Sequence, residues 1–530
     1  MPTIHLIGRP PFAGELQRFC DRSGWRLSSS ADFPQTAGLQ ADDRFILCSN
    51  GDTQALRQLE RLAAIARTWN GEHGEEVKFH VQLVLQTAVA LQAVRLADFS
   101  PKVNRWLDVD LFSLPEMWAQ RVLCALPHPE TDHEAIGEET DSYPPLDRQP
   151  ICPDSPTTVH FVVSGSGETA QALVRMAALV CHYPNYVRNP RLRTRITWLA
   201  PDIESVGSLF RHRHNELFSR SHWRSISLAK VQPTVSFEHR PEGCPTEEDE
   251  FVDVEWEFVS GTPTHPAFRN KLALWAEDAC QQLTVALTGD SDAENAELAM
   301  GLPEALATAR CTVLVEQRDD ILVSTLRHAP QWSHLHAFGM ERSAYNPLLP
   351  RHRLARMLNA FYAASYSAAP FSLDEAEVDR LWQQVPSPAL RDSNLANVLT
   401  FRTKMRSLGH DETQGDTFYA LSADEAQLLS EVEHNRWSVE RLMAGFRPPT
   451  PAEHEAIRLN IEAHISARTA GKPTPEVDLK RQMKNERRIH FDLCPYRHLG
   501  VDATGRDVRS YDTDLTACIP LLMHRWSSLL

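Results

Sequence analysis

The sequence predicts an α/β fold that is followed by a mainly α-helical region: two units with parallel sheets, then a smaller helical domain. Three observations lead to this prediction. Short apolar strands alternate with amphipathic helices as far as about residue 345. A glycine-rich turn joins one of these strands to a helix. Beyond about residue 353, strand-like runs disappear. At about 150 residues per domain, a chain of 530 residues has room for three or four domains.

The first α/β unit is expected to span residues 1–126. Gly8 ends its first strand, but prolines follow it and the next glycine comes too late for a phosphate-binding turn. We therefore expect a degenerate half-site here. The predicted strands are Thr3–Ile7, Arg44–Cys48 and Val77–Leu85, and the predicted helices are Gly51–Trp69 and Pro115–Leu126.

Residues 127–158 are rich in Pro, Asp and Glu and lack periodicity, which predicts an acidic linker or surface connection. The second α/β unit is expected to span residues 159–345. Its predicted strands are Val159–Ser164, Arg195–Leu199, Asp253–Val259, Leu283–Thr288 and Cys311–Val315, and its predicted helices are Glu168–His182 and Ala293–Ala309. The two units are consistent with a diverged duplication.

The second unit contains the pattern G-x-G-x-x-A between its first strand and first helix, which is typical of Rossmann-like dinucleotide sites. The glycines allow a tight turn and close approach of a pyrophosphate, and the helix N-terminus offers free N–H groups. The acid that usually binds the ribose is missing, because Ala200 stands there and Asp202 follows two residues later. A Rossmann-like fold with a degenerate pocket explains the pattern equally well. The candidate residues for NAD or a related nucleotide are Gly165, Ser166, Gly167, Glu168, Thr169 and Asp202.

The helical domain is expected to span residues 346–530, with a charged insertion at about 448–485. Its most informative segment is a helix that starts with a capping box formed by Ser422 and Glu425. Within this helix Arg436 is spaced to pair with glutamates three residues before and four residues after it. Trp437 and Arg441 are spaced for a cation–π contact. A bundle helix with a core tryptophan and a salt-bridged face explains the same pattern.

The run Glu433-His434-x-Arg436-Trp437, with Gly445-Phe446 after it, resembles the signature helix of the ryanodine-receptor repeat (RyR) domain. Two later segments, His490 to Tyr496 and Tyr511 to Pro520, resemble the remaining motifs of that family. In prokaryotic members, tandem TrkA/RCK-type NAD-binding domains precede this domain, which is the order expected here. The sequence departs from the family pattern at Phe446, Phe491 and Thr513 and by its long insertion.

The resemblance implies a regulator that senses a nucleotide-derived ligand, in systems similar to antiviral defence modules, and it implies no catalytic residue. A base would stack on Trp437 or Tyr496, while Arg436 or Arg391 would face a phosphate. Because RCK-type domains usually dimerise, a homodimer or higher homo-oligomer is expected. The candidate ligand-binding residues are Arg391, Asn394, Glu433, His434, Arg436, Trp437, Arg441, Tyr496 and Asp512.

Composition argues against several classes of partner. The formal net charge of −16 makes nucleic acid an unlikely ligand. Ten scattered cysteines form no CxxC pair and no zinc-ligand pattern, so no metal is predicted and the thiols are expected to be reduced. Since the sequence contains no signal-peptide pattern and no apolar run of about 20 residues, we expect a cytoplasmic protein. A membrane or effector partner would then be a separate protein.

Two alternatives remain open at this point. The first is an NAD(P)-dependent oxidoreductase, although no Ser/Lys/Tyr set at dehydrogenase spacing is present. Glu433 and His434 are adjacent on a helix and face different directions, and the neighbouring Cys181 and His182 do not by themselves indicate an activated thiol. The second alternative is a cytoplasmic regulatory subunit of an ion channel or transporter.

Overall fold

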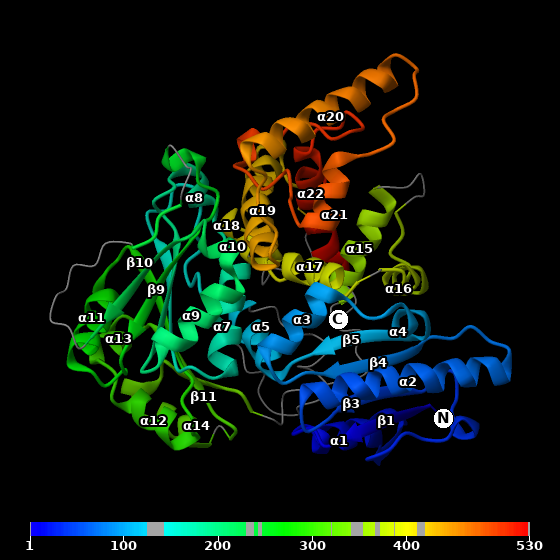
Figure 1. Ribbon diagram of the computed structural model, residues 1–530. Coiled ribbons are helices and arrows are strands. Elements are labelled where there is room, and N and C mark those ends of the chain that lie inside the picture. The colour runs from blue at the N-terminus through cyan, green and yellow to red at the C-terminus, as the bar shows by residue number, and fades with distance from the viewer. Residues whose placement is uncertain are drawn as a thin grey trace.

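A computed structural model shows two α/β bodies, with a helical body above their junction (Figure 1). The first sheet and its helices are blue to cyan, the second body is cyan to green, and the helical body is yellow to red. The structure describes residues 2–124, 143–228, 238–241, 246–319, 321–340, 353–365, 371–385, 387–410 and 419–527.

The first body is a parallel five-stranded sheet in the order β2-β1-β3-β4-β5. Helices α2 and α4 cover one face of the sheet, while α1 and α5 pack on the other. This order has its switch point between β1 and β3. The strands are β1 Thr3–Gly8, β2 Arg26–Ser30, β3 Arg44–Cys48, β4 Phe79–Val84 and β5 Leu107–Phe112, and the helices are α1 Ala13–Ser23, α2 Asp52–His73, α3 Ala88–Ala97, α4 Pro101–Trp106 and α5 Leu114–Cys124.

The second body is a parallel seven-stranded sheet in the order β12-β11-β10-β6-β7-β9-β8. Without the edge strand β8, this is the strand order of Rossmann-type dinucleotide-binding folds. Its strands are β6 Thr158–Ser164, β7 Thr194–Ala200, β8 His222–Ser227, β9 Val254–Ser260, β10 Gln281–Leu287, β11 Thr312–Glu316 and β12 Leu335–Phe338, and its helices are α7 Glu168–Val180, α8 Pro184–Arg188, α9 Ile203–Arg213, α10 Asn215–Phe218, α11 Pro266–Glu277, α12 Asp292–Met300, α13 Glu304–Thr308 and α14 Ile321–Arg327.

The third body is helical, and the long helix α19 lies against the second body (Figure 1). Its predicted capping box is confirmed, because the Ser422 and Glu425 side chains each accept a hydrogen bond from the other's backbone N–H. The insertion folds as a hairpin of two helices, α20 and α21. The helices are α15 Arg353–Ser365, α16 Glu375–Gln383, α17 Pro388–Val398, α18 Phe401–Ser407, α19 Ala423–Met443, α20 Pro451–Thr469, α21 Leu479–Arg487 and α22 Arg509–Ser527.

The structure confirms every strand predicted from sequence and adds four, namely β2, β5, β8 and β12. These four are short, polar or interrupted by charges, as the sequence RLSSS of β2 and LDVDLF of β5 illustrate. The predicted helix Ala293–Ala309 is instead two helices, α12 and α13, because Gly301 and Pro303 interrupt it.

The predicted surface connection at 127–158 falls partly outside the described residues, which resume at Tyr143. From there part of the chain is packed against the protein and part of it is exposed. Leu146 and Ile151 are buried, and the Tyr143 hydroxyl donates a hydrogen bond of 2.9 Å to the carbonyl oxygen of Ala337. A few apolar side chains anchor this segment to the protein. Its Pro-rich and acidic composition therefore did not show which of its residues are buried.

One hydrophobic core runs through all three bodies. Helix α5 of the first body packs on α7 of the second, and α19 packs on α7, α8 and α10 as well as on α17 and α22. Trp118, Leu173 and Val439 belong to the same buried cluster although they come from three bodies. Among the described residues, no helix is long and apolar enough to span a membrane.

Candidate functional site

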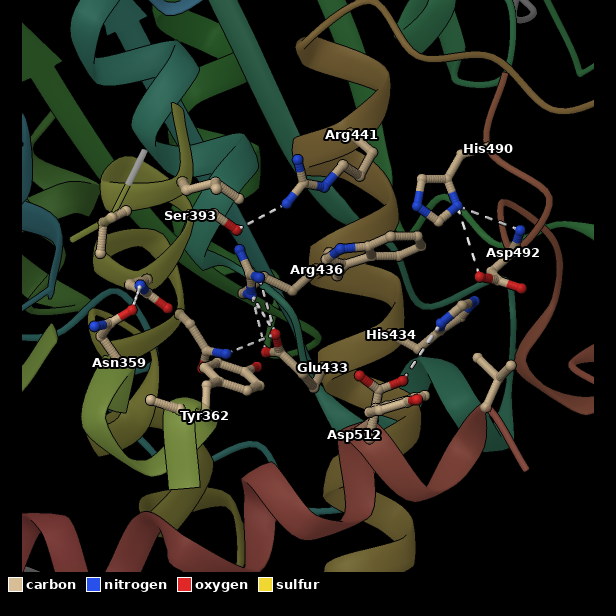
Figure 2. Close-up of a pocket in the computed structure, with 18 of the residues that line it drawn as sticks. Asn359, Tyr362, Ser393, Glu433, His434, Arg436, Arg441, His490, Asp492 and Asp512 are labelled. Carbon is tan, nitrogen blue, oxygen red and sulfur yellow. Dashed lines mark hydrogen bonds and ion pairs between the residues drawn. The ribbon is translucent and has the colours of Figure 1, made fainter. Parts of the chain in front are cut away.

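A cavity of about 610 Å³ lies beside α19 in the helical body (Figure 2). We call it the C-terminal cavity. Helices α15, α17, α19 and α21 contribute to its wall together with the start of α22. Seven of the nine residues predicted for the RyR-like site line it: Asn394, Glu433, His434, Arg436, Trp437, Arg441 and Asp512.

The floor of the C-terminal cavity contains a buried ion cluster around Glu433. The guanidinium of Arg436 donates to Glu433 at 2.8–3.1 Å and to Glu440 at 2.8 Å, and the Lys404 ammonium donates to Glu433 at 2.6 Å. Burial alone would raise the pKa of Glu433, but the charges of Arg436 and Lys404 outweigh it and hold the pKa at about 2. Arg436 is therefore already engaged by two carboxylates, which argues against its predicted role of facing a phosphate.

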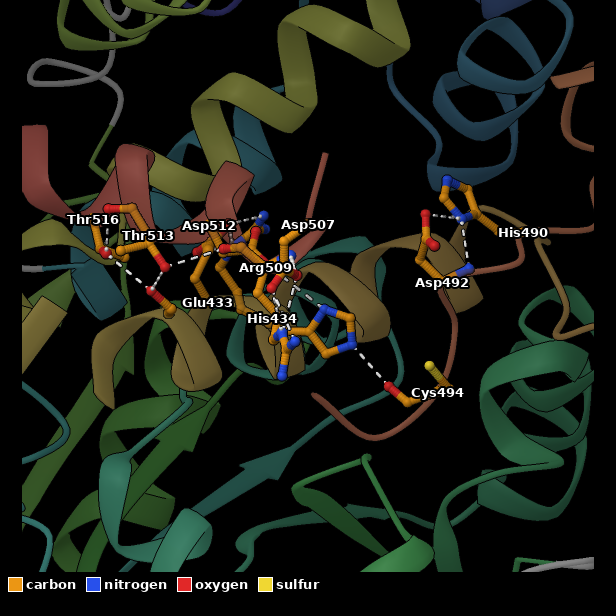
Figure 3. A network of polar contacts seen from close by, with 12 residues as sticks. Glu433, His434, His490, Asp492, Cys494, Asp507, Arg509, Asp512, Thr513 and Thr516 are labelled. Carbon is orange, nitrogen blue, oxygen red and sulfur yellow. Dashed lines mark hydrogen bonds and ion pairs between the residues drawn. The ribbon is translucent and has the colours of Figure 1, made fainter. Parts of the chain in front are cut away.

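His434 is fixed between two partners at one side of the cavity (Figure 3). Its Nε2 donates to the carbonyl oxygen of Cys494 at 2.8 Å, and its Nδ1 lies 3.6 Å from the Asp512 carboxylate. Burial alone would lower the pKa of His434, but the Asp512 carboxylate outweighs this and raises it. Tyr496, predicted as a stacking residue, packs edge-on against His434 at 5.7 Å between ring centroids and is not among the cavity-lining residues.

Trp437 supplies an aromatic surface to the cavity. Its side chain is half-buried, and the guanidinium of Arg441 lies 5.8 Å from the ring centroid, so the predicted cation–π contact is confirmed. The His490 ring meets the Trp437 ring edge-on at 4.7 Å. Burial and the nearby charges of Lys484 and Arg441 lower the pKa of His490 well below its usual value, so this imidazole is neutral at pH 7.

Amide and cationic groups complete the lining. The Nδ2 of Asn397 donates to Glu433 at 2.9 Å, while its Oδ1 is buried without a hydrogen-bond partner in the described part of the chain. Lys484 of α21 has neither an ion pair nor a hydrogen bond to any described residue. The sequence analysis named His490 only as the start of an RyR-like segment, and it did not single out Lys484, Asn359 or Tyr362. The charged insertion was not expected to contribute to the site, and α15 contains no motif.

Arg391 does not line the C-terminal cavity. It instead joins α17 to β5 in the first body, donating to Asp108 at 2.6 Å and to Asp110 at 3.1 Å. Its guanidinium also lies 5.3 Å from the ring centroid of Trp382. The residue predicted to face a phosphate is therefore part of a contact between bodies.

The glycine loop has the predicted backbone geometry. Gly165 has a φ of +124°, and a Cβ there would lie 2.2 Å from the Thr288 carbonyl oxygen, so only glycine fits where β6 and β10 diverge. Ala170 is fully buried, as expected for close packing of helix on sheet. Gly8 is the equivalent residue of the first body, because its Cβ would lie 1.6 Å from the Cys48 carbonyl oxygen.

The surroundings of the glycine loop are acidic. Glu168 accepts a hydrogen bond of 2.8 Å from the backbone N–H of Ala88 at the start of α3. Glu316 accepts one of 2.7 Å from the Thr169 hydroxyl, and burial raises the pKa of Glu316. Ser166 and Gly167 complete the turn, and Asp202 is exposed where α9 begins. Two carboxyl groups therefore border the turn, and a negative charge on either would disfavour a pyrophosphate there.

No family model matches the chain, and no curated protein matches it. The solved structures that superpose on the chain include three dehydrogenases, and all three superpositions are loose. An NAD-complexed D-isomer-specific 2-hydroxyacid dehydrogenase from Lactobacillus delbrueckii ssp. bulgaricus has 8% identity and a TM-score of 0.19, with 78% of this chain and 98% of that chain covered. D-2-hydroxyisocaproate dehydrogenase has 9% identity and a TM-score of 0.18, with the same coverage. A D-lactate dehydrogenase from Sporolactobacillus sp. has 8% identity and a TM-score of 0.19, again with that coverage.

These superpositions are too loose to carry an argument about function. The Rossmann-like character of the second body rests instead on its own strand order and on the turn at Gly165. Among the residues that the structure describes, no cluster of three or more His, Cys, Asp or Glu side chains is arranged to hold a metal ion.

Proposed function

We propose that this protein is a nucleotide-responsive regulator whose ligand binds in the C-terminal cavity. The observation that carries the proposal is the set of groups around that one space. Trp437 contributes an aromatic surface, and the side-chain amide oxygen of Asn397 has no hydrogen-bond partner among the described residues. Lys484 contributes a cation with no carboxylate partner in the described chain. The cavity volume of about 610 Å³ is within the range of small-molecule sites.

Each group has a counterpart in a nucleotide. A base can stack on the half-buried Trp437 ring, an interaction worth about 1–3 kcal/mol. The amides of Asn359, Asn394 and Asn397 offer donors and acceptors for the edges of a base or for ribose. Lys484 and Arg441 place positive charge at the α21 side of the cavity, where a phosphate would be stabilised. Binding without turnover is expected, in line with the RyR resemblance.

The regulator would act by linkage, because a ligand that binds one arrangement of the bodies more tightly shifts the population toward it. Homo-oligomerisation, an effector or membrane partner and a role in antiviral defence belong to the same proposal and rest on the family resemblance alone.

Calorimetric titration of the full chain with NAD, ADP-ribose, cyclic ADP-ribose, ATP and cyclic dinucleotides tests the proposal. We expect at least one of them to bind and Trp437→Ala to weaken its binding by roughly 5- to 150-fold, which corresponds to the loss of one stacked base. Trp106→Ala, which removes a half-buried tryptophan of α4 that does not line the C-terminal cavity, is the matched control. Equal affinity in wild type and Trp437→Ala, or no binding of any of these nucleotides, would contradict the proposal.

A further inference from the structure

A second cavity, of about 530 Å³, lies where the three bodies meet. We call it the junction cavity. The first body contributes α3 and α5 to its wall, the second body α7 and α9, and the helical body α17, α19 and α21. Leu390, Ser393, Arg441 and Lys484 line both this cavity and the C-terminal cavity, so the two spaces are neighbours.

The lining of the junction cavity is cationic although the whole chain is acidic. Six arginines and lysines face four acidic residues, which leaves two positive charges uncompensated. The acids are largely occupied. Glu116 accepts from Arg95 at 2.6 and 2.8 Å and from Arg175 at 3.0 Å, and Asp392 also pairs with Arg95. These acids therefore contribute little to neutralising the other cations.

Three of the cations form no ion pair with any carboxylate that the structure describes. The guanidinium of Arg213 donates to the Gln171 side chain at 3.2 Å. Arg488 donates to the backbone carbonyl oxygens of Ala444 at 3.0 Å and Leu96 at 2.7 Å, and so connects the helical body to the first body. Lys484 is the third of these cations. Because each guanidinium has five donors, both arginines retain N–H groups for a ligand.

Two further polar atoms of lining residues are unsatisfied. The Nε of Arg441 and the Oε1 of Gln92 are buried and have no hydrogen-bond partner within the described chain. Buried polar groups are normally paired, so such atoms indicate a missing partner. Leu179, Met443 and Phe446 add an apolar surface to the same wall.

We infer that the junction cavity is a second binding site, for a phosphorylated small molecule with an apolar or aromatic body. Its phosphate group would be held by Arg213, Arg488 and Lys484, and its body would lie against Leu179, Met443 and Phe446. Since these cations come from the second and helical bodies and Arg488 also contacts the first, a bound anion stabilises the arrangement of all three bodies. The inference does not depend on the proposed function, because neither Arg213 nor Arg488 lines the C-terminal cavity.

Phenyl phosphate is a suitable probe, since it combines an aromatic body with a single dianionic group. Calorimetric titration of the full chain is expected to show binding that weakens as salt is added. Arg213→Gln and Arg488→Gln should each raise Kd about tenfold or more, the effect of losing one charge-assisted hydrogen bond. Arg57→Gln removes the same charge from an exposed position on α2 and should leave Kd unchanged.

Trp437→Ala separates this inference from the proposed function. It should leave phenyl phosphate binding intact while weakening nucleotide binding. Loss of phenyl phosphate binding in Trp437→Ala together with retention in Arg213→Gln would overturn the inference, because the probe would then occupy the C-terminal cavity. No binding at millimolar probe would also overturn it. If Arg488→Gln lowers the thermal midpoint, the Kd of Arg213→Gln decides the question, since the Arg213 guanidinium makes one hydrogen bond to a side chain within the described residues.

Discussion

The glycine loop between β6 and α7 and the C-terminal cavity beside α19 both carry residue patterns typical of nucleotide binding, but their polar groups are arranged differently. At the glycine loop, the carboxylates of Glu168 and Glu316 border the turn, and Glu168 is bonded to the first body. At the C-terminal cavity, the acids Glu433 and Glu440 are neutralised inside the wall, while the Trp437 face and Lys484 border open space.

The comparison separates two meanings of a sequence motif. The G-x-G-x-x-A pattern fixes a strand–turn–helix geometry, and Gly165 meets that requirement through its contact with Thr288. Whether the turn also binds phosphate depends on charges that come from other parts of the chain. Glu316, for example, lies 147 residues beyond its partner Thr169. A motif therefore predicts the fold more securely than the ligand.

The largest expected effect concerns the wall of the C-terminal cavity. Arg436→Met should lower the free energy of unfolding by about 3–5 kcal/mol, because it leaves the buried Glu433 and Glu440 carboxylates with fewer partners. Arg458 is a matched control, since it pairs with Glu455 and Glu462 at the same i−3 and i+4 spacing on an exposed face of α20. Arg458→Met should change little. Chemical denaturation measures both, and equal effects would show that burial of the cluster is unimportant.

The second effect concerns the glycine loop. Gly165→Ala should destabilise the protein by about 2–3 kcal/mol, because its Cβ meets the Thr288 carbonyl oxygen and its φ is positive. Gly167→Ala meets no atom within 4 Å and should cost less than about 1 kcal/mol. Thermal denaturation tests the pair. Gly167→Asp adds a charge at the turn and should leave nucleotide affinity unchanged, and a loss of affinity in that variant would move the site to the loop.

The smallest effect is a pH dependence that belongs to the C-terminal cavity. Burial, with the charges of Lys484 and Arg441, lowers the pKa of His490, so the folded protein keeps this imidazole neutral where the unfolded chain, with a pKa near 6.5, takes up a proton. The free energy of unfolding of the wild type, compared with that of His490→Gln, should therefore fall as the pH drops below about 6.5, by about 1.4 kcal/mol per pH unit. Denaturation curves from about pH 7.5 to about pH 5.5 measure the difference. A pH-independent difference would mean that His490 takes up its proton over the same pH range in the folded and the unfolded protein.

Local patterns predicted most of the regular structure. The strand at β6, the turn at Gly165 and the capping box at Ser422 each follow a local sequence pattern, and the structure confirms all three. The sequence did not predict elements or buried residues whose structure depends on contacts with distant parts of the chain. The polar edge strand β2 forms because β1 supplies its hydrogen bonds, and buried Leu146 reflects packing against distant elements.

The same division holds for the candidate site. Seven residues of the RyR-like set were predicted to lie together, and they line the C-terminal cavity because most of them belong to one helix, α19. Arg391 was predicted to belong to the same set, but it pairs with Asp108 of the first body, and no local sequence pattern indicates that partner. Lys484 belongs to an insertion that the sequence analysis did not connect with the site, and its side chain lines the cavity while remaining exposed to solvent. It reaches the cavity because the hairpin begins and ends at paired residues, Arg447 and Ile489.

The continuous hydrophobic core has a consequence for how the chain can be divided. Trp118, Leu173 and Val439 belong to one buried cluster that joins the three bodies. Cutting between the bodies would expose apolar surface on both sides, so a fragment of one body is expected to be poorly soluble by itself. The three bodies should melt in one cooperative transition, and recombination with foreign domains should be poorly tolerated. The shared core thus predicts one cooperative folding unit rather than a string of exchangeable modules.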